Sequence, residues 1–509
     1  MEDNAELIPL KRGSFRALTD IRRPGYAISE GGSLSISNSE PVLRFSIQRT
    51  GDHDVSVSET YIASIIEDIQ VSLRELDANP PLTLVEEWAT LIHECLSAES
   101  RKFHSVHHVF EISAGCDPIQ LLAAFFRDCI KCVTDGELVP RQERYVADIF
   151  NRQGYVVDNQ GQDRLIQMIM DIFELTNGQS LGKATELDVF LSAILMAKVL
   201  KETLNETILI QIVVCMEASI PFREQALMKL YQKLQLVNTK YDLKLNDQEI
   251  VVAVQRAADF SNRNLGNFSS EDAVFFLDHT WSLLPERSRE LRRFHLYSVN
   301  DMLHACQGMA EFFETLNPDL VFQSFRGIPN EQEMNFFQTR LMSNLEKGRK
   351  YTRAQLLSVS ICAAIATLSG GDGPMSFFTG DLPTHNYHSQ RLGETFPTFD
   401  YKDITKGCDY DVYVILNRGR QQEQSFDTRN SPLAAYVYAI LGDEGVCSAL
   451  RYCQCPMTEL SSKQLLRNLP EQSVRLVAND IGMIAVSRTE IIQNLMVELF
   501  ESATESQLG

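Results

Sequence analysis

From Ser58 onwards, apolar residues recur along most of the chain at intervals of three and four. This spacing places them on one face of a helix. The first stretch of this kind carries Tyr61, Ile62, Ile65, Ile66, Ile69 and Leu73. Similar stretches follow to the end of the chain, and two of them predict separate helices over Asn330–Lys347 and Thr352–Leu368. The sequence therefore predicts an all-α fold.

Residues 1–57 lack this periodicity and are rich in Ser, Gly and Arg, so we predict a flexible N-terminal arm. The whole chain has 509 residues, which exceeds the ~100–200 residues of an ordinary domain. We divide its helical part into 58–240 and 241–509. No Pro/Gly/Ser-rich linker separates these regions, so we expect them to pack against each other as one body.

The formal net charge of −21 argues against general binding to nucleic acid or to anionic membranes, because the protein and these surfaces repel each other. The 11 cysteines are scattered, as is typical of reduced thiols. No apolar signal segment follows Met1, and the apolar runs Ile208–Met216 and Leu356–Leu368 are shorter than the ~20 residues that span a bilayer. We therefore expect a soluble, cytoplasmic protein.

The stretch Phe103–Ile112 has the highest density of groups that bind metals or transfer protons. It contains His104, His107 and His108, three of the ten histidines of the chain. Residues four apart share a helical face, so His104 and His108 are expected to point towards one place. Asp128, about one helix later, can complete a divalent-metal or acid–base site.

These residues belong to a wider pattern. An aromatic residue is followed by His-x-x-x-His, then by an apolar helix that ends in Phe-Phe-x-Asp, and then by Gln-Glu-Arg at 142–144. This pattern resembles the HD superfamily of metal-dependent phosphohydrolases, to which the cyclic-nucleotide phosphodiesterases belong. The resemblance covers residues 60–240 and implies an HD-like helical domain there. It gives no role to residues 241–509.

The resemblance implies a role for each matched residue. His104 would donate a proton to the leaving oxygen, and Glu143 would support the metal-bound water. His108 and Asp128 would bind the metal ion. A further carboxylate on a later helix would complete the metal site; Asp188 is one candidate, although the register favours Ser192, which is a weak ligand.

The chain departs from the HD pattern at Arg127, where the superfamily has a metal-binding histidine. A guanidinium has no free lone pair and cannot bind a metal ion. We therefore expect a divalent ion to bind weakly or not at all. Arg127 could instead bind the phosphate of a ligand as a bidentate fork, or simply pair with a nearby carboxylate.

Three functional hypotheses follow. The first is a regulatory pseudo-enzyme with a degenerate metal site that binds a phosphorylated small molecule or a protein partner. The second is an active metal-dependent phosphohydrolase with substitute ligands such as His104, His107 or Asp188. The third is a helical scaffold for protein–protein interaction. A polar loop at 262–268, followed by Asp278 and His279, is predicted to cap a helix rather than to line a pocket.

Overall fold

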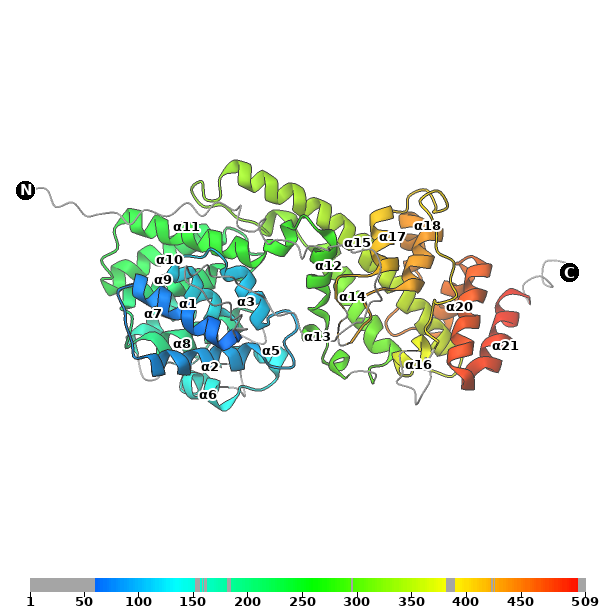
Figure 1. The fold of residues 1–509 in the computed structure, drawn as a ribbon, viewed down its shortest axis with the longest axis horizontal. Coiled ribbons are helices and arrows are strands. Elements are labelled where there is room, and N and C mark those ends of the chain that lie inside the picture. The colour runs from blue at the N-terminus through cyan, green and yellow to red at the C-terminus, as the bar shows by residue number, and fades with distance from the viewer. Residues whose placement is uncertain are drawn as a thin grey trace, which may run out of the picture.

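The structure is a computed structural model that describes residues 60–151, 156–157, 159, 163–180, 185–293, 296–380, 390–422, 424 and 426–501. The predicted arm, 1–57, lies outside the described residues. The predicted all-α fold is confirmed, and the strands β1 (Phe150–Asn151) and β2 (Val156–Val157) form one small antiparallel pair. Figure 1 shows an elongated molecule in which an N-terminal half, blue to green, lies beside a C-terminal half, yellow to red.

The N-terminal half has its own hydrophobic core, which extends from Ile65 to Phe260 and also includes Phe325. Its helices are α1 (Tyr61–Glu75), α2 (Leu82–Leu96), α3 (Val106–Ser113), α4 (Pro118–Arg127), α5 (Cys132–Asp135), α6 (Pro140–Val146), α7 (Arg164–Ile172), α8 (Thr185–Leu200), α9 (Glu206–Ala218), α10 (Ala226–Tyr241) and α11 (Asp247–Asn264). The helix α11 therefore packs with the first core, although the sequence analysis placed it after the boundary at 240/241.

The second core extends from Leu265 to Leu499. Its helices are α12 (Ala273–Trp281), α13 (Leu284–Arg287), α14 (Val299–Thr315), α15 (Glu331–Leu368), α16 (Met375–Thr379), α17 (Tyr410–Arg418), α18 (Pro432–Leu450), α19 (Glu459–Arg467), α20 (Glu471–Ile484) and α21 (Thr489–Phe500). Short 3₁₀ turns connect some of them: η2 (Gly266–Ser269), η3 (Arg289–Arg292), η4 (Pro318–Leu320) and η5 (Val486–Arg488). The region without a recognised motif is thus a packed helical body.

Local sequence accounts for where many of these helices begin. Asp117 caps α4, and its carboxylate and the side chain of Gln120 bond to each other's backbone amides in a capping box, with Pro118 in the first turn. The helix α11 begins with the same arrangement between Asn246 and Glu249. These caps satisfy amides that a helix leaves without internal partners.

The helix α15 forms the spine of the second half. It packs on α14, α18 and α19, and in Figure 1 it extends from above the N-terminal half into the C-terminal half. The prediction of two separate helices, Asn330–Lys347 and Thr352–Leu368, is wrong, because the chain stays helical through Gly348. Gly348 is buried where α15 meets Phe313 of α14, so packing stabilises a residue that ordinarily weakens helices.

A substitution at Gly348 tests this packing. A Cβ atom there would lie 2.6 Å from Cε1 of Phe313, so we expect Gly348→Ala to lower the free energy of unfolding by about 1–3 kcal/mol through overpacking. Gly308 of α14 is exposed and its Cβ would meet nothing within 4 Å, so Gly308→Ala should raise stability by about 0.5–1 kcal/mol. Urea unfolding measures both. Equal effects of the two substitutions would contradict the close contact.

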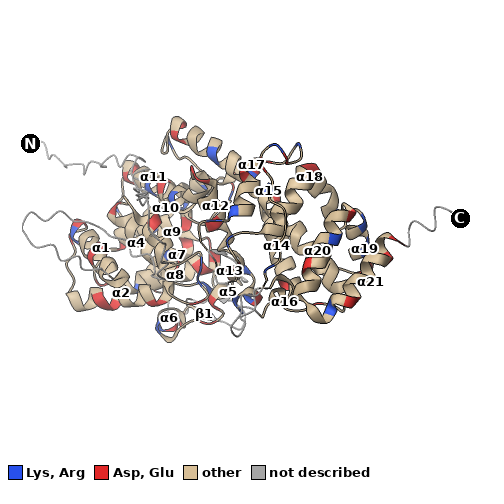
Figure 2. Ribbon diagram, turned by 45° about the vertical axis from the view of Figure 1, so that its right-hand side comes forward, with Lys and Arg blue, Asp and Glu red and all other residues tan. Residues whose placement is uncertain are grey.

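Two described helices, α15 and α18, are long and apolar enough to cross a membrane by composition alone. The apolar window of α15 is 78% buried inside the protein and that of α18 is 56% buried. Core packing therefore accounts for much of their apolar character. In the view of Figure 2, acidic and basic residues are interspersed along the helices of both halves.

Candidate functional site

Glu286 of α13 holds the turn that precedes α3. Its Oε1 atom accepts three consecutive backbone N–H groups at 2.9, 2.8 and 3.0 Å, those of Lys102, Phe103 and His104. Its Oε2 atom lies 2.6 Å from Nδ1 of His104. One carboxylate from the second half of the chain thus fixes both the backbone and the ring of the first histidine.

This contact changes the predicted geometry of the histidines. The helix α3 begins at Val106, after Ser105, so His104 precedes the helix. The prediction that His104 and His108 share a helical face is therefore wrong, although the centroids of their rings lie 6.2 Å apart. Ser105 is extended and ends the turn that Glu286 holds, so the helix can begin only at Val106.

The buried Glu286 and the partly buried His104 both have shifted pKa values. Burial, together with the charge of Lys131, lowers the pKa of His104 to about 4. Burial alone would raise the pKa of Glu286, but the facing imidazole and the backbone amide of His104 lower this pKa to about 2. Glu286 is therefore a carboxylate at neutral pH, and the ring of His104 donates to it from Nδ1.

A second group of side chains joins α3 to α12. His108, Glu111 and His279 each offer a ligand atom, and these three atoms lie within 4.8 Å of one another. Nδ1 of His108 is 3.8 Å from a carboxylate oxygen of Glu111, and Nδ1 of His279 is 3.9 Å from the same oxygen. Burial lowers the pKa of His279 to about 3. The arrangement combines two imidazoles with one carboxylate, a donor set that suits transition metals.

Asp128, a predicted metal ligand, lies completely buried between two cations. Oδ2 is 2.6 Å from Nη1 of Arg127, and Oδ1 is 2.9 Å from Nζ of Lys131. Burial opposes ionisation of this carboxyl, but Arg127 and Lys131 hold its pKa well below the usual range. Arg127 also donates from Nε to Oγ of Ser219 at 2.7 Å, and from Nη2 to the Ser219 carbonyl at 3.4 Å. All three of its nitrogens therefore have acceptors within the protein.

The other predicted site residues take different positions. Asp188 is buried and its Oδ1 accepts the backbone N–H of Cys132 at 2.8 Å; burial raises its pKa to about 6. Ser192 accepts the backbone N–H of Ile130 at 2.9 Å. Glu143 is exposed on α6. The structure therefore places Asp188 and Ser192 as anchors of the segment after Asp128, and a catalytic role of His104 or Glu143 stays a prediction.

The sequence analysis missed the parts of the site that come from distant segments. Glu286 and His279 follow the histidine stretch by more than 150 residues in the chain. Glu111 and Lys131 are close in sequence to the predicted residues. Helical spacing could have indicated Glu111, which follows His108 by three positions on α3, whereas Lys131 pairs with Asp128 in the non-helical segment between α4 and α5. No local signal indicates Glu286.

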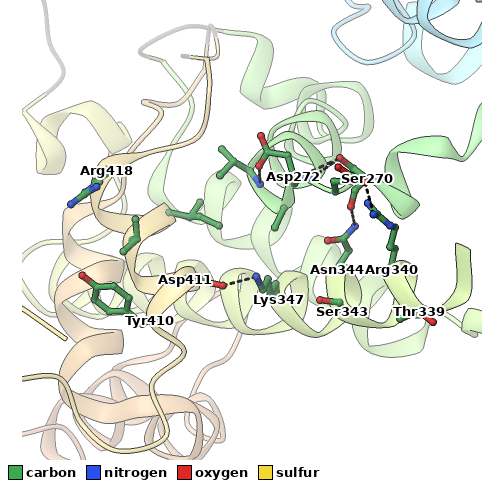
Figure 3. Close-up of a pocket in the computed structure, with 15 residues that line it drawn as sticks. Ser270, Asp272, Thr339, Arg340, Ser343, Asn344, Lys347, Tyr410, Asp411 and Arg418 are labelled. Atoms are coloured by element: carbon green, nitrogen blue, oxygen red, sulfur yellow. Dashed lines mark hydrogen bonds and ion pairs between the residues drawn. The ribbon is translucent and has the colours of Figure 1, made fainter. Parts of the chain in front are cut away.

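A surface groove away from the histidine stretch is a further candidate for a ligand-binding site (Figure 3). It has a volume of about 880 Å³ and lies between α12, α15 and α17. Lys347 pairs with Asp411 at 2.7 Å, and Arg340 pairs with Glu271. Asn344 donates to the carbonyl of Ser270 at 2.9 Å. These polar groups bind one another across the groove, so they hold the helices together and have less capacity for a ligand.

Neither a family model, nor a curated protein, nor a solved structure matches this chain. What the site can do follows from its own geometry.

Proposed function

We propose that this chain is a non-catalytic, regulatory protein of HD-like design, in which fixed side-chain cations take the place of a metal ion beside Asp128. One observation carries the proposal. The carboxylate of Asp128 makes buried ion pairs with Arg127 at 2.6 Å and with Lys131 at 2.9 Å. Both of its oxygens are therefore already neutralised by groups that belong to the protein.

The charges around Asp128 also disfavour a divalent ion. Arg101, which is 4% exposed, donates from Nη1 to the backbone carbonyl of Asp128 at 2.5 Å, but Asp135 balances its charge at 2.6 Å, so Arg127 and Lys131 are the cations that face the carboxylate. A metal ion would meet the repulsion of these cations at short range in a poorly solvated interior. Displacing one of them would leave a buried charge without its partner, which is strongly unfavourable.

The proposed role is therefore binding, to a phosphorylated small molecule or to a protein partner, without turnover. A phosphate group at Arg127 is the weaker form of this proposal, because the phosphate would have to displace Ser219 or Asp128 from the guanidinium. A binding partner that leaves these internal contacts intact is favoured.

A phosphoesterase assay tests the absence of turnover. We expect the purified full chain to hydrolyse bis(p-nitrophenyl) phosphate and p-nitrophenyl phosphate no faster than its Asp128→Asn variant, with Mg²⁺, Mn²⁺ or Zn²⁺ present. Asp188→Asn is a second variant at the same centre, and Glu290→Gln, an exposed site, is the matched control. Metal-dependent turnover that falls at least ~10-fold in both centre variants, but not in the control, would overturn the proposal.

The second candidate is a metal-dependent phosphohydrolase with substitute ligands, and the group His108, Glu111 and His279 is the observation that favours it. The same assay separates the two candidates. Turnover that disappears in His279→Gln but persists in Asp128→Asn would support this enzyme and exclude a purely regulatory protein.

A further inference from the structure

We infer that His108, Glu111 and His279 form a binding site for a divalent transition-metal ion, and that this ion ties α3 of the first core to α12 of the second. This site is separate from the ion pairs of Asp128 and does not depend on the proposed function. Neither Glu111 nor His279 belongs to the pattern that resembles the HD superfamily.

The distances fit a metal site that closes by a small movement. Ligand atoms at ~2.0–2.1 Å from a tetrahedral Zn²⁺ are roughly 3.3–3.5 Å apart. The carboxylate of Glu111 lies 3.8 Å from His108 and 3.9 Å from His279, and all three ligand atoms lie within 4.8 Å of one another. Side-chain shifts of up to about 0.7 Å each would therefore bring them to coordination distance.

His108 provides an independent indication of a missing ligand. His108 is 3% exposed, and neither its Nδ1 nor its Nε2 atom has a hydrogen-bond partner among the described residues. A buried imidazole normally has a partner for each nitrogen, because an unsatisfied polar atom in the interior is unfavourable. A metal ion between His108 and its neighbours would supply a partner for one of these two nitrogens.

Aromatic rings surround the site and limit which other groups can bind the nitrogens of His108. The ring of Phe103 lies 4.7 Å from that of His108 and 4.5 Å from that of His279, measured between centroids. Phe275 stacks on His279 at 5.5 Å. These rings hold both imidazoles in place beside Glu111. Preorganised imidazole and carboxylate donors favour Zn²⁺, Co²⁺ or Ni²⁺ over Mg²⁺ and Ca²⁺, which prefer oxygen ligands.

His107 marks the side that is open to solvent. Its side chain is 50% exposed, and its Nδ1 lies 3.4 Å from the other carboxylate oxygen of Glu111. A metal ion can therefore reach Glu111 along this side, and water can complete a four-ligand shell.

Calorimetric titration of the EDTA-treated full chain with Zn²⁺ and Co²⁺ tests the inference. We expect one equivalent of either ion to bind, with the visible spectrum of a Co²⁺ site that contains nitrogen ligands, and with a rise in the midpoint of thermal unfolding. Glu111→Gln and His279→Gln should each weaken Zn²⁺ affinity at least ~10-fold. The partly buried His93, on α2, provides the matched control: His93→Gln should leave the affinity unchanged.

Circular dichroism establishes that each variant is folded. Binding of no ion, or unchanged affinity in both Glu111→Gln and His279→Gln, would overturn the inference. Loss of Zn²⁺ binding in Asp128→Asn, with retention in His279→Gln, would place the metal at the HD-like centre and overturn both proposals. Phosphoesterase activity alone would overturn only the proposed function.

Discussion

Replacing Arg127 with methionine is expected to lower the free energy of unfolding by about 3–5 kcal/mol, because it leaves part of the charge of a buried carboxylate without its partner. Arg127 and Asp128 are 2% and 0% exposed, and their ion pair has a length of 2.6 Å. The substitution also removes the donor to Ser219, 92 positions later in the chain. Chemical denaturation followed by circular dichroism measures the loss.

Two comparisons make this result specific. Arg74 is exposed on α1 and donates to a carbonyl of its own helix, so Arg74→Met should change stability by less than about 0.5 kcal/mol. The triple variant Arg127→Met, Asp128→Leu, Lys131→Met removes the carboxylate together with both of its cations and should recover part of the loss, since apolar side chains often replace buried ion pairs without cost. If Arg127→Met lowers the free energy of unfolding as little as Arg74→Met does, Lys131 alone neutralises Asp128.

The helices could largely be predicted from the sequence because their cause is local. The spacing of apolar residues by three and four predicts a helix over residues 61–73. It matches α1, whose Ile65, Ile69 and Leu73 are buried in the first core. The prediction was wrong where tertiary contact decides the structure. A glycine ordinarily weakens a helix, but Phe313 packs against Gly348 and α15 continues through it.

In the candidate site, too, some residues could be predicted from the local sequence and others could not. The sequence indicated His108 and Asp128, which are close together in the chain and have side chains typical of metal sites. It could not indicate that Glu286 and His279 complete the surroundings, because the helices α13 and α12 that carry them contact the histidine stretch only in the folded protein. It left two uses of Arg127 open, binding a phosphate or pairing with a nearby carboxylate. The structure shows the ion pair, with Asp128, together with hydrogen bonds to Ser219 at the end of α9.

Glu286 gives the second large expected effect. We expect Glu286→Ala to lower the free energy of unfolding by at least ~3 kcal/mol at pH 7, because three partly buried hydrogen bonds from backbone amides and the contact with the ring of His104 are lost together. Glu290, an exposed carboxylate next to the same segment, supplies the control, and Glu290→Ala should have an effect below about 0.5 kcal/mol. Urea unfolding at pH 7 measures both variants.

The pH dependence of stability separates the charge of Glu286 from its packing. Its pKa is about 2 in the folded protein and 4.5 in its ordinary range, so the unfolded state binds the proton more readily. The stabilisation by this carboxylate is therefore fully present above pH 4.5 and is lost as the pH falls towards 2, with a total of about 3 kcal/mol. Glu286→Gln should remove this part of the pH dependence. If the variant and the wild type lose stability equally between pH 4.5 and 2, other carboxylates cause the acid unfolding, and Glu286 holds the histidine turn by shape and hydrogen bonding rather than by charge.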